Sequence, residues 1–381
     1  MDICSFVDGR IPVTDLSLDT YISTENMLPN KEGITCSAGL PRISHTQAYQ
    51  TGDVLISNIR PYFRKIWLAD RGGGCSNDVL VLRANQKIDT GFLYYLLSDD
   101  SFFDYMTATA KGTKMPRGDK DAIMQYEVPD LPLNMQIVIA NILSVFDDKI
   151  NLNKRINHHL EQMAQALYKS WFVDFEPWDG VMPDGWREGT LGQFVEIKRG
   201  GSPRPIQDFL SDTGFRWLKI SDVTALQTPY ILAIKEHIKE EGLKKTVFLK
   251  SGSLVLSNSA TPGIPKILGV DTCIHDGWLY FPSSLFSTEY LYLFFKHIRQ
   301  NLIVLGNGSV FTNLKTDILK NYAANIPDEQ SLQDFDEMVI PLFLTMENCT
   351  RESAHLADLR DTLLPRLMSG NLQVSDLKPG K

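Results

Sequence analysis

The sequence predicts an α+β fold in which two similar mixed α/β globular domains are separated by two long antiparallel helices that form a coiled coil, with internal pseudo-two-fold symmetry. Three observations lead to this prediction. A heptad pattern without Gly or Pro covers residues 133–172, a similar pattern covers 331–367, and segments of the first half recur in the second. Apolar residues spaced alternately by four and three are typical of a helix that packs along its length on another helix. The expected boundaries are 1–130 for the first domain, 131–176 for the central spacer, 177–328 for the second domain and 329–381 for the C-terminal spacer and tail.

The first domain begins with strand-like segments. Residues 53–59, 65–69 and 78–84 are short, apolar and separated by Gly, Asn and Pro, which is typical of strands joined by turns. A short helix is expected at 91–105 and a loop at 110–117. The sequence therefore predicts a β-rich globule with little helix ahead of the central spacer.

The central helix has an apolar seam that is interrupted by Asn153 and Asn157. At 1.5 Å per residue it would be about 55–60 Å long, whereas a packed core helix usually has about 10–14 residues, so it is expected to be a spacer. A polar residue in a seam fixes the register of a helix pair at a cost in stability. Two alternatives stay open: the seam opens to water there, or this part of the helix faces a partner subunit. The predicted seam consists of Ile139, Leu143, Phe146, Ile150, Asn153, Asn157, Leu160, Ala164, Leu167 and Trp171.

The C-terminal helix is expected to be the partner of the central one. Ser331 followed by Asp334 predicts a capping box at its start. Pro341 predicts a kink and Pro365 predicts an early, frayed end. The alternative is two unrelated amphipathic helices, each covering its own domain. The predicted seam of this helix consists of Phe335, Met338, Leu342, Thr345, Cys349, Leu356, Leu359 and Leu363.

An internal repeat connects the two halves. The segment GDVLISN at Gly52 returns as GSLVLSN at Gly252, and CSNDVLVL at Cys75 returns as CIHDGWLY at Cys273. Further pairs follow in the same order, and the offsets stay between 196 and 200 residues, which is far longer than a solenoid period. Collinear matches at one spacing indicate that the chain consists of two copies of one unit, a globule followed by a long helix.

Composition restricts the class of protein. The net charge of −8 counts against DNA binding by the chain alone, because free-standing DNA-binding proteins are usually basic. Local basic patches or a partner subunit would remove this objection. The chain has five scattered cysteines and no recognisable signal peptide, which favours a cytoplasmic protein. It has no apolar run of ~18 residues, so no membrane segment is expected.

Two different globules at the ends of a rigid spacer suit the recognition of two DNA sites a fixed distance apart, since one turn of B-DNA is about 34 Å. Over essentially its whole length the chain resembles the DNA-specificity subunits of type I restriction–modification systems. The internal repeat, the order of the matching segments and the ends of the long helices all agree with that family. The matching segments are GDVLISNIRP from Gly52, QALYKSWFVDF from Gln165, WREGTLGQFVEIKRGGSP from Trp186, SGSLVLSNSATPG from Ser251 and LRDTLLPRLMSGNLQV from Leu359.

The resemblance implies a non-catalytic subunit that directs other proteins to DNA. Its two target-recognition domains would each read half of a bipartite site in double-stranded DNA, while the paired helices set the gap and dock two methyltransferase subunits. S-adenosylmethionine, ATP and Mg are then expected in partner subunits, including a restriction motor subunit, and no cofactor or metal is expected in this chain. One departure concerns the start of the first domain, where residues 3–9 match 194–200, so this copy lacks the lead-in of the second.

Candidate DNA contacts gather in loops at matching places of the two copies. Phosphate contacts require Lys, Arg or glycine-rich amides, and base reading requires polar side chains on exposed loops. In the first domain the candidates are Asn58, Arg60, Arg64, Lys65, Lys111, Gly112, Thr113, Lys114 and Arg117. In the second domain they are Lys198, Arg199, Arg204, Asn258, Ser259, Thr261, Lys266, Asn307, Gly308, Ser309 and Thr312. For a single Lys or Arg the alternative is a solvated surface charge, and Asn58 and Asn258 are alternatively residues that end strands.

Two other functions compete with DNA recognition. An enzyme with its own active site would need a cofactor loop, and the chain has neither an Asn/Asp-Pro-Pro-Tyr/Phe tetrapeptide of an amino-methyltransferase nor a GxxxxGK[ST] loop for ATP. A protein–protein scaffold that does not read DNA directly fits the negative charge. It predicts that no duplex sequence is selected even when partner subunits are present.

Overall fold

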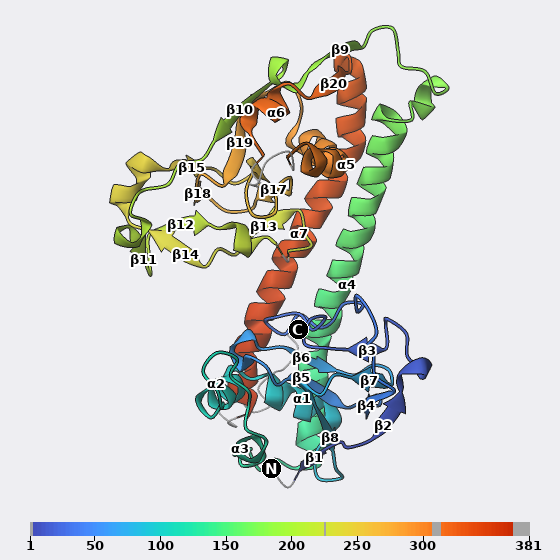
Figure 1. Cartoon of the computed structure of the whole chain (residues 1–381), viewed down its shortest axis with the longest axis vertical. Coiled ribbons are helices and arrows are strands. Elements are labelled where there is room, and N and C mark those ends of the chain that lie inside the picture. Colours follow the sequence, from blue (N-terminus) through green and yellow to red (C-terminus); the bar gives the residue numbers. More distant parts are fainter. Residues whose placement is uncertain (1–2, 225, 307–313, 369–381) are drawn as a thin grey trace, which may run out of the picture. The chain divides into compact units, whose positions relative to one another are not determined.

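The computed structural model describes residues 3–224, 226–306 and 314–368. The chain divides into two compact units, and the boundary falls inside both long helices. Unit 1 consists of Met1–Lys149 and Leu356–Lys381, and unit 2 consists of Ile150–His355. Each unit combines mixed β-sheets with short helices and with a segment of each long helix, as the labels in Figure 1 allow the reader to follow.

Unit 1 contains two four-stranded sheets. In the order of pairing the first is β1 (Cys4–Phe6), β8 (Val79–Ala84), β5 (Val54–Ser57) and β6 (Ile66–Leu68), and the second is β2 (Arg10–Pro12), β4 (His45–Tyr49), β7 (Gly73–Cys75) and β3 (Tyr21–Ile22). All pairs are antiparallel except β3 with β7. The three strands predicted from the apolar segments are confirmed as β5, β6 and β8, all within one sheet.

The helices of unit 1 differ in one respect from the sequence prediction. The single helix expected at 91–105 is two helices, α1 (Thr90–Ser98) and α2 (Asp100–Ala108), followed by α3 (Lys120–Met124). The break occurs at Asp99, whose carboxylate accepts a hydrogen bond from the backbone N–H of Ser101 at 2.8 Å and caps α2. A capping residue in extended conformation therefore separates two helices within one apolar stretch.

Unit 2 repeats this plan with more strands. In the order of pairing one sheet is β10 (Val195–Arg199), β19 (Trp278–Ser284), β16 (Leu254–Ser257), β17 (Pro265–Leu268) and β13 (Tyr230–Ile231). The other is β11 (Leu210–Ser211), β14 (Glu236–Ile238), β12 (Phe215–Leu218), β18 (Thr272–Ile274) and β15 (Val247–Leu249). The remaining elements are the antiparallel pair β9 (Arg187–Thr190) and β20 (Ala323–Ile326), with α5 (Thr288–Gly306) and α6 (Thr316–Lys320).

The strand orders show that the sequence repeat is also a repeat of topology. The order β1-β8-β5-β6 in unit 1 matches the order β10-β19-β16-β17 in unit 2. The first strand of unit 1, β1, therefore corresponds to β10, which confirms the predicted match of residues 3–9 with 194–200. The lead-in of the second copy forms β9, which pairs with β20.

Both long helices are continuous. α4 spans Leu133–Phe172, as predicted, and α7 spans Glu329–Met368 with Pro341 inside it. The capping-box start predicted at Ser331 is two residues late, since α7 begins at Glu329 and Asp328 accepts the N–H of Ser331 at 2.7 Å. The predicted early end at Pro365 is also wrong, because the helix continues to Met368.

The most buried face of α7 in unit 2 differs from its predicted seam. Phe335, Val339 and Phe343 are fully buried, whereas Met338 keeps 36% of its surface. Phe335 packs on both neighbouring helices, with the Phe172 ring of α4 at 4.7 Å and the Tyr290 ring of α5 at 6.1 Å, and Phe343 contacts Tyr292 of α5 at 5.4 Å. The most buried face of α7 in unit 2 therefore packs on α5 as well as on α4.

The other seam residues follow the prediction in part. Within unit 1, Ile139 and Leu143 of α4 share a core with Leu364 and Leu367 of α7. Buried seam residues are Ile139, Leu143, Ile150, Asn153, Ala164 and Phe335, and partly buried ones are Phe146, Asn157, Leu160, Leu167, Trp171, Leu342, Cys349, Leu356 and Leu363.

The polar interruption of α4 is paired within unit 2. Asn153 is fully buried, and its Nδ2 donates to Oε2 of Glu352 at 2.7 Å and to Oγ of Ser353 at 3.3 Å. Nδ2 of Asn157 donates to Oγ1 of Thr350 at 3.0 Å. The alternative in which Asn153 meets water is therefore wrong, and both amides bond polar residues of α7.

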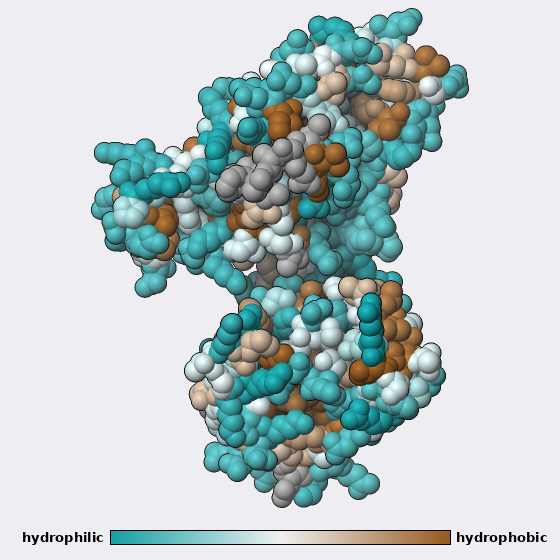
Figure 2. All heavy atoms as spheres, viewed as in Figure 1, coloured by the Kyte–Doolittle hydropathy of each residue, from teal (hydrophilic) through white to brown (hydrophobic). Residues whose placement is uncertain are grey.

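In the part of the chain that the structure describes, no helix is long and apolar enough to cross a bilayer. The face drawn in Figure 2 is mostly hydrophilic, and its apolar residues form separate patches.

Candidate nucleic-acid interface

The candidate residues of unit 1 meet around Asp78, and we call the group Asn58, Arg60, Asp78 and loop 111–117 the Asp78 cluster. The N–H of Asn58 donates to the carbonyl of Asp78 at 2.8 Å, and the N–H of Arg60 donates to the carbonyl of Pro116 at 2.8 Å. Nη2 of Arg117 lies 2.8 Å from Oδ1 of Asp78. Two segments more than fifty residues apart are thus joined into one surface.

Loop 111–117 places positive charge on this surface. Its ends are paired, since Lys111 and Arg117 exchange backbone hydrogen bonds of 2.8 and 2.9 Å. The residues at 111–115 and Arg117 are exposed, and Gly112 adopts φ +95°, which favours glycine. The Lys111 ammonium group pairs with the Asp119 carboxylate, and this hydrogen bond raises the pKa of Lys111.

Two other candidates of unit 1 have partners within the protein. Nη1 of Arg64 lies 2.7 Å from Oδ2 of Asp100. Nζ of Lys65 donates to the carbonyl of Thr24 at 2.6 Å, and burial lowers the pKa of this ammonium group. Both side chains stabilise the turn that follows β5.

That turn carries a feature that the sequence analysis missed. Arg60 and Arg64 both adopt left-handed backbone conformations, with φ of 52° and 51°, on either side of the 3-10 turn Pro61–Phe63. Tyr62 and Phe63 are 50% and 38% exposed, and their rings contact each other at 4.8 Å. A left-handed backbone costs free energy at a residue other than glycine, and such strain is often retained at functional sites. The strained backbone on either side of the exposed aromatic residues is therefore the feature that points to this turn as part of a functional site.

In unit 2 the corresponding group surrounds Asp276, and we call Ser202, Arg199, Arg204, Asn258 and Asp276 the Asp276 cluster. Oγ of Ser202 donates to Oδ1 of Asp276 at 2.6 Å, and Nη2 of Arg204 lies 3.3 Å from Oδ2. Nε of Arg199 donates to the carbonyl of Asp276. The hydrogen bond from Ser202, with the nearby arginines, lowers the pKa of the Asp276 carboxyl group. Lys198 is outside this group and pairs with Glu196 at 2.8 Å.

Several polar candidates of unit 2 are buried. Nδ2 of Asn258, which is 3% exposed, donates to the carbonyl of Asp276 at 3.2 Å. Ser259 and Thr261 are half-buried beside it. Lys266 was expected near an exposed loop, but it lies in β17, is 5% exposed and donates to the carbonyl of Leu226 at 2.7 Å. That expectation is wrong, because a lysine in the middle of a sheet strand faces the interior there.

The two clusters share one junction. In unit 1 the carbonyl of Asn58 accepts the N–H of Gly118 at 3.2 Å, just after the exposed loop. In unit 2 the carbonyl of Asn258 accepts the N–H of Leu314 at 2.7 Å. Four candidates, Asn307, Gly308, Ser309 and Thr312, lie outside the described residues.

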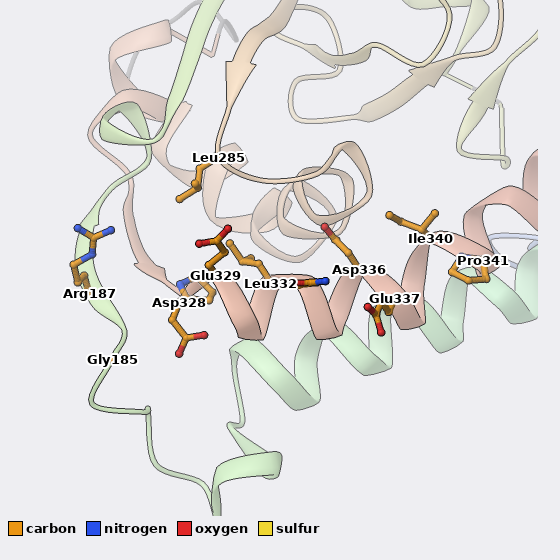
Figure 3. Close-up of a pocket in the computed structure, with 12 residues that line it drawn as sticks. Gly185, Arg187, Leu285, Asp328, Glu329, Leu332, Asp336, Glu337, Ile340 and Pro341 are labelled. Atoms are coloured by element: carbon orange, nitrogen blue, oxygen red, sulfur yellow. The ribbon is translucent and has the colours of Figure 1, made fainter.

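A second surface of unit 2 is acidic. A groove of about 1020 Å³ runs beside the first three turns of α7, and Asp328, Glu329, Asp336 and Glu337 line it. Figure 3 shows these carboxylates on α7 or just ahead of it, with Arg187 on the opposite strand. Exposed apolar side chains take part as well, notably Leu285, which is 54% exposed.

Among the residues that the structure describes, no group of three or more His, Cys, Asp or Glu is placed to hold a metal ion.

Comparisons with known proteins show which proteins this chain is similar to. A relative from Methanocaldococcus jannaschii, the type I restriction enzyme MjaIX specificity subunit, is 27% identical over 308 residues, covering 75% of this chain and 70% of its own length. The type I restriction enzyme HindI specificity subunit from Haemophilus influenzae is 24% identical over 455 residues, covering 97% of this chain and 98% of its own.

One solved structure shows the same fold. The type I restriction–modification S subunit from M. genitalium has a TM-score of 0.54 with 16% identity, covering 94% of this chain and 96% of its own. The model of the type I restriction modification DNA specificity domain matches residues 2–162 and again residues 183–335, once in each half of the repeat. A double match of this extent means that the chain belongs to the DNA-specificity subunits of type I restriction–modification systems, the non-catalytic subunits that recognise DNA in these complexes.

Proposed function

We propose that each unit reads one word of a bipartite DNA site, unit 1 through the Asp78 cluster and unit 2 through the Asp276 cluster. The observation that carries the proposal is the repeated junction at Asn58 and Asn258. The scaffold is the same in both units, whereas the side chains around it differ. Because base identity is read by side chains, two units with different side chains would read two different words.

We propose further that α4 and α7 form an antiparallel coiled coil with pseudo-two-fold symmetry and set the gap between the words. In unit 1 the start of α4 shares a core with the end of α7. In unit 2 the end of α4 shares a core with the start of α7, where the rings of Phe172 and Phe335 lie 4.7 Å apart. Both contacts support opposite directions for the two helices.

The partners proposed for this chain follow from its family. They are double-stranded DNA and two methyltransferase subunits, with a restriction motor subunit in addition, all in the cytoplasm. S-adenosylmethionine, ATP and Mg would be bound by those subunits. The acidic groove beside α7 supports a protein partner, since the four carboxylates that line it would repel phosphates and, with the exposed Leu285, would suit a basic, partly apolar segment.

Selection from random duplexes tests the DNA proposal. The chain is mixed with its methyltransferase subunits, and bound duplexes are recovered and sequenced. We expect two short fixed words separated by a gap of constant length and free sequence. A single continuous word, or no enrichment above the methyltransferase alone, would contradict the proposal.

Exposed arginines of the two clusters are expected to act mainly on affinity. Arg117→Gln or Arg204→Gln removes one positive charge, so the slope of log affinity against log salt should fall by about one in the assembled complex. Arg71→Gln is the control in unit 1, because Arg71 is partly exposed and stacks on Trp67 outside the Asp78 cluster. Fluorescence anisotropy over a salt series measures the slope, and an equal change in the control would count against the assignment.

Charge reversal in the acidic groove should weaken assembly. We expect Glu329→Lys with Glu337→Lys to lower the affinity for the methyltransferase subunit at least tenfold, because both carboxylates are exposed in the groove. Glu241→Lys, on the exposed 3-10 turn Glu240–Lys245, is the control. Association is measured by surface plasmon resonance, and unchanged assembly of the double variant would place the partner elsewhere.

A further inference from the structure

A polar cavity in unit 2 is independent of both clusters. It has a volume of about 340 Å³ and lies between α5, β17 and the segment that precedes β13. Its polar lining includes Thr261, Lys266, Tyr292, Lys296 and Arg299. None of the described residues that line it is acidic.

Three hydrogen-bond donors at this cavity have unused capacity. Nε of Arg299 and Oγ1 of Thr261 are buried and have no hydrogen-bond partner among the residues that the structure describes. In its protonated form, Nζ of Lys266 carries three donors and uses two of them, on the carbonyls of Leu226 and Thr228 at 2.7 and 2.5 Å. Buried polar groups are nearly always paired, so three incomplete donors at one cavity call for an acceptor that the described residues do not supply.

The charges around the cavity favour a negatively charged acceptor. Lys296 is neutralised by Glu161 of α4 at 2.9 Å, and Glu161 also accepts the hydroxyl of Tyr292 at 2.6 Å. Lys266 and Arg299 remain as a pair of like charges. Burial lowers the pKa of Lys266 to about 7, with Lys296 and Arg299 lowering it further and Glu161 opposing them. A bound anion would relieve this repulsion.

We propose that this cavity binds a tetrahedral oxyanion, as free sulfate or phosphate or as a phosphate group of DNA, through Arg299, Lys266 and Thr261. An oxyanion offers several acceptors to one donor from each residue, and charge-assisted hydrogen bonds to such groups are about twice as strong as neutral ones. The inference goes beyond the proposed function, because anion binding can be measured on the chain without DNA.

Calorimetric titration of the full-length chain with sulfate, at constant ionic strength against chloride, is the test. We expect saturable binding at one site, weakened at least tenfold by Arg299→Gln and severalfold by Thr261→Val. Sulfate does not titrate near neutral pH, so proton uptake on binding would report the rise in the pKa of Lys266. Lys250→Gln is the matched control, since it removes an exposed charge paired with Asp271 outside the cavity.

A second arm distinguishes the two sources of the oxyanion. If DNA supplies it, Arg299→Gln lowers the salt slope of duplex binding by about one and sulfate competes with the duplex. If a free anion supplies it, the variant leaves that slope unchanged while sulfate binding is still lost. Circular dichroism and the unfolding midpoint confirm that each variant is folded. No saturable sulfate binding, or equal binding by folded Arg299→Gln, would overturn the proposal whether or not the chain reads a bipartite site.

Discussion

Inserting one heptad into both long helices is expected to lengthen the gap of the DNA site by about two to three base pairs and to leave both words unchanged. Seven residues add about 10.5 Å along a helix, which equals about three base pairs at 3.4 Å each, and any tilt of the helices reduces this. Suitable positions are between Lys149 and Ile150 and between His355 and Leu356, where the chain passes from one unit to the other.

The insertion has to be made in both helices because their side chains are paired. An insertion in α4 alone, placed after Asn153, would move Asn157 away from Thr350 while Asn153 kept Glu352. We expect that single insertion to destabilise the helix pair and to abolish selection of either word. The double insertion after Lys149 and after His355 leaves both pairs intact, because all four residues lie within Ile150–His355. It also nearly preserves the phase of each helix, since a heptad differs from two turns by only ~20°.

Selection from random duplexes, with wild type in parallel, measures the outcome. Each added base pair also rotates one word about the DNA axis, so the affinity of the double variant for its new site should be lower than that of the wild type for its own. An unchanged gap in a folded double variant would show that the helices do not set the spacing. Altered words would contradict the separation of reading from spacing.

Most of the architecture could be predicted from the sequence, because it depends on patterns that are either local, as in a long helix, or repeated in the two halves of the chain. A 40-residue heptad pattern without Gly or Pro leaves little choice but a long helix, and α4 begins and ends where the pattern does. The repeat matched the segment that forms β5 with the one that forms β16, and the segment that forms β1 with the one that forms β10. These inferences needed periodicity and spacing, and no knowledge of which distant residues meet.

The sequence did not predict the positions and roles of residues that depend on tertiary contacts. Lys266 looked like a loop residue, yet carbonyls of a distant segment bind its ammonium group inside the globule. Asp78 and Asp276 were not selected as site residues, although each organises a cluster. Their signal was present in the matching CSNDVLVL and CIHDGWLY segments, in which the aspartate is the only acidic residue of each. The role of an acidic residue at the centre of basic loops could be recognised only from the structure.

The second large effect is expected on stability, from a substitution in the most buried face of α7. Phe335→Ala should lower the free energy of unfolding of unit 2 by about 3–5 kcal/mol, because it removes a fully buried ring. That ring contacts Phe172, Tyr290 and Trp171 at centroid distances of 4.7, 6.1 and 6.0 Å. Guanidinium unfolding followed by tryptophan fluorescence suits this measurement, since Trp171 reports on the same cluster.

Met338→Ala is the matched control for this prediction. Met338 belongs to the predicted seam of α7 as Phe335 does, but 36% of its surface is exposed, so we expect a loss below about 1 kcal/mol. A large difference between the two variants would mean that the face of α7 that packs on both α4 and α5 carries much of the stability of unit 2. Equal losses would mean that the buried ring of Phe335 contributes no more than a half-exposed position of the predicted seam. In that case the contacts of this ring with Phe172, Trp171 and Tyr290 would add little to the stability of unit 2.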